Sequence, residues 1–215
     1  MQLLQLLSEH LQNGNPTKVA ELTRKAITDG IHPKKILDDG LIAGMSVVGE
    51  KFRDHEIFLP DVLLAAKAMY AGLDLLKPLM IKDDIKSIGK VVIGTVQGDL
   101  HDIGKNLVAI MLKGAGFEVI DLGNDVSPQK FVAAAEQEKA DVIGMSALLT
   151  TTMPVMKSVV DLAKERQLYG KVKIVVGGAP LSNDYAKEIG ADAYCFDGMN
   201  AVETVKRFIA SNPLT

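Results

Sequence analysis

The segment 97-QGDLHDIGKN-106 combines the residue types of this sequence that are best suited to hold a transition metal. Imidazole is a common ligand for borderline transition metals, so His101 is the candidate ligand. A carboxylate two residues away, Asp99, can accept a hydrogen bond from the other ring nitrogen, which fixes the tautomer and raises the basicity of the ligating nitrogen. Gly104 has no Cβ, so a bulky group could approach the chain there. Taken alone, so short a pattern also fits an exposed histidine beside a charged neighbour.

Two glycine-rich phosphate sites do not fit this segment. Five residues separate Gly98 from Gly104, whereas a P-loop has four, and Asn106 stands where a P-loop needs Ser or Thr for magnesium. A dinucleotide fingerprint is excluded because the segment contains no G-x-G-x-x-G. The segment is therefore not predicted to bind nucleotide phosphates.

From residue 90 onward, short β-branched runs alternate with helical runs. Strands separated by helices form a parallel sheet with right-handed crossovers, covered on both faces. The pattern predicts an α/β fold, a flavodoxin-like (Rossmann-type), doubly wound five-stranded domain over residues 90–215, with ligands beyond the carboxyl ends of its strands. Strands are expected at 90–96, 117–121, 141–145, 172–176 and 193–196, helices at 103–115, 127–138, 154–167, 182–189 and 201–210, and site loops at 97–103, 122–127, 146–153, 177–182 and 197–200.

The preceding residues have the period of helices. Asn15-Pro16, His32-Pro33 and Leu59-Pro60 each place a proline in the first turn of an expected helix, with apolar residues following at helical spacing. Four helices with short joints predict a small antiparallel bundle, a helical domain over residues 1–80. The charged segment 81–89 shows no clear period and is expected to be the linker.

Composition excludes several classes of function. A formal net charge of -3 provides no basic field for nucleic acid or an anionic membrane, and no apolar run reaches the length of a membrane span. The single cysteine, Cys195, excludes an internal disulfide and a multi-thiolate metal site. Residues 1–11 have no basic stretch ahead of an apolar core and no small-residue cleavage site, so a signal peptide is not expected. A cytoplasmic protein is expected.

The spacing of three short motifs resembles the cobalamin-binding signature. Residues 105–145 separate Gly104 from 146-SAL-148, and residues 149–176 lead on to 177-GG-178. These motifs match D-x-H-x-x-G-x41-S-x-L-x26–28-G-G at every specified position. The segment 45-MSVVGEKFRDHEIFLPDVLLAAKAM-69 is similar to the cap of the B12-binding region of methionine synthase and of small corrinoid proteins. Over its whole length the chain resembles the corrinoid proteins of methyltransferase systems.

The resemblance implies roles for individual residues. In that family a protein histidine replaces the cofactor's dimethylbenzimidazole tail below cobalt, so His101 would be the metal ligand and Asp99 its hydrogen-bonded partner. The displaced tail enters a slot beside the sheet. Residues implied to line that slot or to leave room in it are Ser146, Leu148, Thr150, Gly177 and Gly178, and further cofactor contacts are expected at Gly98, Asp102, Ile103, Gly104 and Gly198.

Thr152 has two interpretations. Methionine synthase continues a proton relay from the aspartate to a serine, and Thr152 occupies the corresponding position, which would give a catalytic relay of His101, Asp99 and Thr152. Alternatively, Thr152 is not the relay residue: Thr150 or Thr151 takes that role instead, or all three threonines cap the helix that begins at Pro154.

The joint between the third and fourth helices carries three apolar candidates. Phe52 and Leu59 correspond to the residues that cover the upper face of the corrin in methionine synthase, where an apolar lid would exclude water. Phe58 is expected to close the bundle core instead.

The resemblance implies a methyl carrier that is not catalytic on its own. Such a protein would bind cobalamin and shuttle a methyl group between a donor-specific methyltransferase and an acceptor methyltransferase with a tetrahydrofolate-type or thiol acceptor, and a reductive activase would be a further partner. The alternatives are the B12-binding subunit of an adenosylcobalamin-dependent mutase and a B12-dependent sensor. Mutases need a large substrate barrel, and the sensors use a DNA-binding domain and a tryptophan, which this sequence lacks. The residues do not identify the methyl donor, whether methanol, methylamine, a methoxylated aromatic or betaine.

Overall fold

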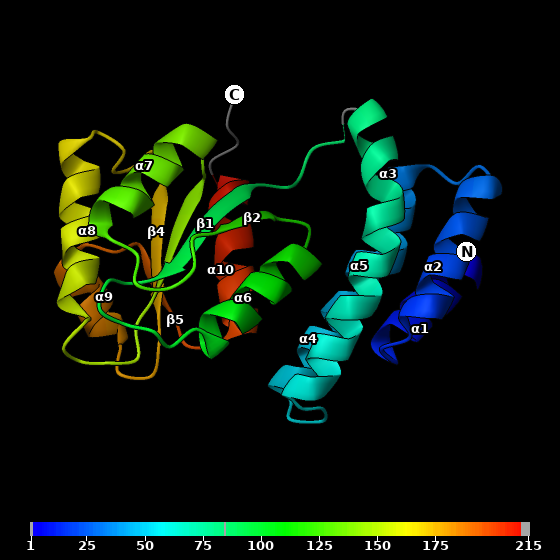
Figure 1. Cartoon of the computed structure of the whole chain (residues 1–215), viewed down its shortest axis with the longest axis horizontal. Helices are drawn as coiled ribbons and strands as arrows, with labels where there is room; N and C mark the ends of the chain where they lie inside the picture. Colours follow the sequence, from blue (N-terminus) through cyan, green and yellow to red (C-terminus); the bar gives the residue numbers. More distant parts are fainter. Residues whose placement is uncertain (1, 84, 212–215) are drawn as a thin grey trace. The chain divides into compact units, whose positions relative to one another are not determined.

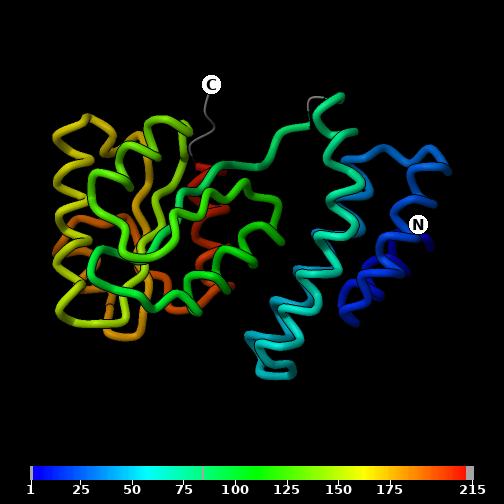
Figure 2. Tube along the Cα trace, viewed as in Figure 1, coloured from blue at the N-terminus to red at the C-terminus, as the bar shows by residue number. Residues whose placement is uncertain are grey.

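The computed structural model describes residues 2–83 and 85–211. Residue 84 of the expected linker, and residues 1 and 212–215 of the expected domains, lie outside the described residues. The chain divides into two compact units (Figures 1 and 2). The helical unit comprises the chain up to Ser87 together with Gly114–Gly116, and the α/β unit comprises Ile88–Lys113 and the chain from Phe117 onward.

The helical unit contains the four helices expected from the sequence. The third is composite, because α3, a π-helical segment η1 and α4 follow one another without a break. Asn15 caps α2, its side chain accepting a hydrogen bond from the Lys18 N–H at 3.0 Å. The bounds are α1 (Gln2–Gln12), α2 (Pro16–Thr28), α3 (Pro33–Ile36), η1 (Leu37–Ile42), α4 (Ala43–Arg53) and α5 (Leu59–Lys82).

Two expectations for the helical unit are corrected. Helix α5 continues to Lys82, so residues 81 and 82 of the expected linker are helical. Phe58 does not close the bundle core, because its side chain is 69% exposed at the N-cap of α5. Its backbone N–H instead donates a hydrogen bond to the Asp61 carboxylate at 2.9 Å, which fixes the start of α5 and leaves the ring in solvent.

The α/β unit contains a five-stranded parallel sheet with strand order β2-β1-β3-β4-β5, as the flavodoxin-like prediction requires. Helices α7, α8 and α9 cover one face, and α6 and α10 cover the other (Figure 1). The strands are β1 (Lys90–Thr95), β2 (Glu118–Asp121), β3 (Val142–Ser146), β4 (Lys173–Gly177) and β5 (Ala193–Cys195), and the helices are α6 (Ile103–Gly114), α7 (Pro128–Glu138), α8 (Pro154–Glu165), α9 (Asn183–Ile189) and α10 (Gly198–Ser211).

The buried β-branched runs explain why the sheet forms. Val92, Ile143 and Ile174 lie on neighbouring strands, are fully buried, and belong to one apolar cluster with Phe131 of α7 and Met156 of α8. Parallel strands covered on both faces require such continuous apolar runs. The core therefore fixes the sheet, and the loops at its carboxyl edge are free to carry polar groups.

The strand register brings the signature motifs together. Thr95 at the end of β1 is paired with Ser146 of β3, and Ser146 is paired with Gly177 of β4. The strand order reverses between β1 and β3, which is where ligands bind in this architecture. At the last strand the sequence-based boundary is wrong: Gly198 is the first residue of α10 rather than part of a loop, because the Asp197 carboxylate accepts the Asn200 N–H at 2.7 Å and starts the helix early.

In the described part of the chain, no helix combines the length and the apolar character that a membrane crossing requires.

Candidate functional site

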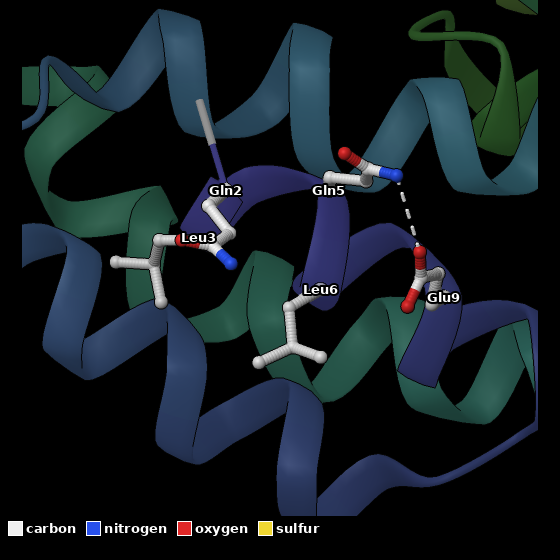
Figure 3. A pocket seen from close by; sticks show the side chains of 5 residues that line it. All are labelled: Gln2, Leu3, Gln5, Leu6 and Glu9. Carbon is white, nitrogen blue, oxygen red and sulfur yellow. Dashed lines mark hydrogen bonds between the residues drawn. The ribbon is translucent and has the colours of Figure 1, made fainter.

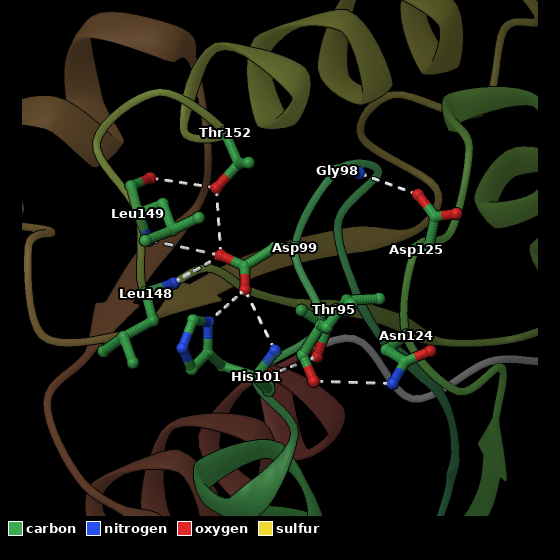
Figure 4. A network of polar contacts seen from close by, with 10 residues as sticks. Thr95, Gly98, Asp99, His101, Asn124, Asp125, Leu148, Leu149 and Thr152 are labelled. Atoms are coloured by element: carbon green, nitrogen blue, oxygen red, sulfur yellow. Dashed lines mark hydrogen bonds and ion pairs between the residues drawn. The ribbon is translucent and has the colours of Figure 1, made fainter.

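Asp99 is the centre of a polar network at the end of β1 (Figure 4). Its side chain is fully buried. Oδ1 accepts the backbone N–H of His101 at 3.0 Å and lies 2.8 Å from the Nδ1 atom of the same residue. Oδ2 accepts the N–H groups of Leu148 and Leu149 at 2.8 and 3.2 Å and the Thr152 hydroxyl at 2.9 Å. The loop after β3 therefore closes on the loop after β1 through one carboxylate.

These donors keep Asp99 ionised. Burial by itself raises the pKa of the carboxyl group, but the hydrogen bonds from the Leu148 and His101 amides, the imidazole and the Thr152 hydroxyl outweigh it and hold the pKa of Asp99 well below its usual range. An ionised carboxylate only accepts hydrogen bonds, so Nδ1 of His101 carries the hydrogen. In the neutral ring, the lone pair is consequently on Nε2.

His101 presents this lone pair at the surface of the unit. Its side chain is 51% exposed, although its Nδ1 atom is tied to a buried group. The Thr95 hydroxyl also donates to the His101 carbonyl oxygen at 2.9 Å, which holds the backbone in place. The arrangement fixes both the tautomer and the position of a ring nitrogen that can ligate a metal.

The surroundings of His101 suit a large apolar ligand. Leu100 and Ile103 on either side of it are 70% and 71% exposed, and Leu148 is partly exposed. A Cβ placed on Gly104 would meet no atom within 4 Å, so this glycine borders open space. Both oxygens of Asp99 are already engaged, and the described residues contain no group of three or more His, Cys, Asp or Glu side chains that could hold a metal ion. A metal held by His101 would therefore bring further ligands with it, as the metal of a corrin ring does.

Thr152 contacts Asp99 and does not cap α8. Its hydroxyl lies 2.9 Å from Asp99 Oδ2 and also 2.9 Å from the Leu149 carbonyl oxygen. The N-cap residue of α8 is Met153, which makes no side-chain capping bond. Of the two interpretations of this residue, the geometry fits the relay, whereas Thr150 is exposed.

Gly178 has a role that the sequence did not reveal. Its φ is +134°, and a Cβ added there would lie 1.8 Å from the Ala147 carbonyl oxygen. At Gly177 a Cβ would lie 3.1 Å from the Cys195 carbonyl oxygen. Both glycines were expected because a side chain would take the space of a ligand. At Gly178, however, a side chain would collide with the backbone of the chain itself, so a glycine is needed there even without a ligand.

The loop after β2 supplies residues that the sequence analysis did not name. The Asp125 carboxylate accepts the Gly98 N–H at 2.8 Å, and the Asn124 side chain reaches the Leu100 carbonyl oxygen at 3.4 Å. The position of this loop was predicted. The only local signal for these contacts is the run Gly123-Asn124-Asp125, which is typical of turns.

The ion pair of Lys105 was also not predicted from the sequence. The lysine side chain is almost fully buried, and Nζ lies 2.6 Å from Asp121 Oδ1 and 2.6 Å from Asn106 Oδ1. The lysine that gives the segment its likeness to a P-loop is therefore one half of an ion pair that joins α6 to the end of β2.

The remaining candidates fall into two groups. Gly98, Asp102, Ser146 and Gly198 lie on or beside the loops at the carboxyl edge of the sheet. Phe52, near the end of α4, and Leu59, the first residue of α5, belong to the helical unit, and both are half-buried. A hollow of about 450 Å³ on α1 contains none of the predicted site residues; its lining is Gln2, Leu3, Gln5, Leu6 and Glu9 (Figure 3).

Comparisons with known proteins agree with this chemistry. The family model of the B12 binding domain matches residues 89–206, and a second model of the same description matches residues 3–77. A dimethylamine corrinoid protein from Methanosarcina barkeri is 44% identical over 210 residues, which is 97% of this chain and 98% of the relative. A corrinoid protein from Desulfitobacterium hafniense is 42% identical over 212 residues, with 97% and 98% covered.

Solved structures give the same result. The methanol:cobalamin methyltransferase complex of Methanosarcina barkeri contains a chain that matches with a TM-score of 0.87 at 32% identity, covering 97% of this chain and 80% of that one. A cobalamin-binding protein from Desulfitobacterium hafniense matches with a TM-score of 0.77 at 29% identity, covering 95% and 98%. The chain therefore belongs to the B12-binding corrinoid proteins of methyltransferase systems, and its cofactor is a corrinoid.

Proposed function

We propose that this protein holds its corrinoid through Nε2 of His101 and carries methyl groups between two methyltransferases. The observation that supports this most directly is the buried Asp99 carboxylate, which keeps the hydrogen of the imidazole on Nδ1. The side chain that carries the remaining nitrogen is half exposed, and its neighbours Leu100 and Ile103 are exposed apolar residues. In this proposal the cofactor is bound with its own benzimidazole off the metal.

The bound corrinoid supplies a cobalt atom that can accept a methyl group and release it. The residues of the chain would supply and orient the metal ligand. His101 would hold the metal through Nε2, and the ionised Asp99 carboxylate would accept the hydrogen bond from Nδ1. The Thr152 hydroxyl donates to the same carboxylate and would complete the relay. We assign these three residues to coupling of ligation and protonation.

The displaced tail of the cofactor is assigned to the ends of β3 and β4. Ser146 and Gly177 are paired in the register, and Leu148 follows directly after β3. Thr150 and Gly178 are assigned to the same slot, and Gly98, Asp102, Ile103, Gly104 and Gly198 to the corrin and its side chains.

The helical unit is assigned to protection of the methyl group. Phe52 and Leu59 flank the joint between α4 and α5 and retain partly exposed apolar side chains. They would exclude water from the upper face of the corrin. The described, non-helical part of the expected linker, residues 83 and 85–89, would serve as the hinge that lets a partner enzyme reach the cofactor.

The partners in this proposal are a donor-specific methyltransferase, an acceptor methyltransferase with a tetrahydrofolate-type or thiol acceptor, and a reductive activase. Support comes from relatives named for dimethylamine and trimethylamine and from the methanol:cobalamin methyltransferase complex. A donor-side enzyme that acts on a small methylated amine or alcohol is therefore the first partner to test.

The ligand assignment is tested with His101→Ala. Protein labelled with ¹⁵N at histidine is reconstituted with unlabelled hydroxocobalamin and reduced to the Co(II) form for electron paramagnetic resonance. The wild type and the control His10→Ala should both show ¹⁵N splitting, because the axial nitrogen comes from the protein. His101→Ala should lose that splitting and retain the corrinoid less tightly. Normal retention with unchanged splitting in His101→Ala, or a benzimidazole nitrogen on cobalt in the wild type, would overturn the proposal.

A further inference from the structure

In the loop between β2 and α7, Asp125 makes two hydrogen bonds to the loop that carries His101. Its carboxylate accepts the Gly98 N–H at 2.8 Å, and its own N–H donates to the Asp99 carbonyl oxygen at 3.1 Å (Figure 4). Asp125 therefore binds the backbone on both sides of the peptide that joins Gly98 to Asp99. It does not contact the imidazole itself.

The backbone of Asp125 is in a conformation that few residue types accept. Its φ is +52°, in the left-handed region, where Asp and Asn are tolerated better than other residues that have a Cβ. The residue that follows is anchored in the sheet, since the Val126 N–H donates to the Thr95 carbonyl oxygen at 3.0 Å. Surrounding contacts thus hold Asp125 in a costly conformation that aims its carboxylate at Gly98.

The start of the same loop is tied to the helix that follows His101. The buried Lys105 ammonium of α6 pairs with Asp121, and Asp121 Oδ1 also accepts the Gly123 N–H at 2.9 Å. The Thr95 N–H in turn donates to the Gly123 carbonyl oxygen at 3.0 Å. Because the loop is anchored before and after Asp125, this residue has little freedom to follow a movement of Gly98.

Gly98 is the flexible point that this bracing would control. Its φ is +83°, and as a glycine it can leave that conformation at low cost. A rotation there would displace the Asp99 carboxylate from the Leu148 amide and the Thr152 hydroxyl. The imidazole, whose Nδ1 is fixed only through Asp99, would then lose its orientation.

We propose that Asp125 is a positioning residue for the metal ligand, holding the Gly98–Asp99 peptide so that His101 presents Nε2 at one place. The inference rests on the proposed ligation by His101 and adds a residue from a different loop to it. What matters is an acceptor oxygen at a left-handed position, so the amide of asparagine should replace the carboxylate of aspartate.

Two substitutions separate the acceptor from the backbone conformation. Asp125→Asn keeps an acceptor oxygen and tolerates the left-handed region, whereas Asp125→Gly keeps the conformation and removes the acceptor. Lys139→Gly is the matched control, because Lys139 has a φ of +53° at the C-cap of α7 and is not among the site residues. Urea unfolding of each apoprotein shows whether the fold has been retained.

Two measurements report on His101. In the apoprotein, ¹H–¹⁵N NMR of the imidazole should show an Nδ1–H protected by its bond to Asp99 in the wild type, Asp125→Asn and Lys139→Gly, and an exchange-broadened or lost signal in Asp125→Gly. In the reconstituted protein, the dissociation constant of the histidine-ligated corrinoid should rise roughly tenfold in Asp125→Gly alone, the effect expected from one lost charge-assisted hydrogen bond.

The inference is overturned if Asp125→Gly keeps the wild-type imidazole signal, or if Asp125→Asn shows the same loss as Asp125→Gly. The imidazole signal requires no cofactor. If the wild type showed no protein nitrogen on cobalt, the proposed ligation by His101 would be wrong. The NMR comparison of the apoproteins would still decide whether Asp125 positions the imidazole ring.

Discussion

Replacing Asp99 by asparagine tests the electrostatics of the site most directly. The carboxylate receives hydrogen bonds on both oxygens, three on Oδ2 and two on Oδ1. Asparagine has one accepting oxygen and one donating NH₂ group. If the oxygen takes the place of Oδ2, the bonds from Leu148, Leu149 and Thr152 survive. The NH₂ group then faces two groups that are donors in the wild type, the backbone N–H and Nδ1 of His101.

The two groups that face the NH₂ group of asparagine respond differently. The ring can move its hydrogen to Nε2 and accept at Nδ1, but the backbone N–H of His101 cannot change its role. One partly buried amide therefore loses a hydrogen bond to a charged group, which costs about 1.5–3 kcal/mol. The surviving bonds weaken because the acceptor is neutral, so we expect Asp99→Asn to lower the free energy of unfolding of the apoprotein by about 3 kcal/mol at pH 7. The tautomer change also removes the lone pair from Nε2, and histidine ligation should fall with it.

The pH dependence provides the assay. The pKa of Asp99 is lowered in the folded state from about 3.9 in the unfolded chain, so its contribution is complete above about pH 5 and is lost as pH falls through the folded-state value. Urea unfolding at pH 5 and 3 should show a smaller difference between the wild type and Asp99→Asn at pH 3 than at pH 5. Asp161→Asn, an exposed member of an ion pair on α8, should change stability by under about 0.5 kcal/mol. A difference for Asp99→Asn that is as large at pH 3 as at pH 5 would refute an ionised, multiply bonded carboxylate.

Three further predictions follow from the glycines and the buried ion pair. Gly104→Ala should leave the free energy of unfolding of the apoprotein unchanged or raise it by up to about 1 kcal/mol, since the new Cβ meets no atom. The same substitution should weaken corrinoid binding at least about tenfold in an equilibrium titration. Unchanged binding would show that Gly104 does not border the corrin. Gly178→Ala should destabilise the apoprotein by more than about 3 kcal/mol in urea, because its Cβ collides with the Ala147 carbonyl oxygen; a loss of binding without a loss of stability would contradict that collision. Asp121→Asn should lower the free energy of unfolding by about 3 kcal/mol in the same assay, because it leaves the buried Lys105 ammonium without its counter-charge. Lys105→Met removes the ammonium itself and should lower the free energy of unfolding less. The reverse order would contradict the burial of Lys105.

Much of the fold could be predicted because its signals are local. Asn15-Pro16 and Leu59-Pro60 mark helix starts by chemistry that lies within a few residues, and the β-branched runs mark strands that are buried on both faces. The π-helical segment η1 carried no such signal, and it was expected as ordinary helix. The exposed ring of Phe58 was missed because an aromatic residue at a helix joint has the same local appearance whether its side chain is buried or solvated.

In the site, too, contacts between residues close in the sequence could be predicted from the residues themselves, and those between distant loops could not. His101 and Asp99 are two residues apart, so their contact follows from local geometry, and Thr152 was found through the resemblance. Asp125 binds Gly98 from 27 residues away, and Lys105 binds Asp121 from 16. Such pairs depend on which loops the sheet brings together, and no spacing within one segment encodes them.

Thr95, Ser146 and Gly177 are paired side by side on neighbouring strands, and this pairing matters for recognising distant relatives. The spacers between the signature motifs pass through turns at the opposite, amino end of the sheet, such as residues 166–172 between α8 and β4. Extra residues in such a turn would alter the count between Leu148 and Gly177 and leave the carboxyl edge intact. A fixed-length pattern search would overlook such a homologue, whereas a comparison of strand pairing would retrieve it.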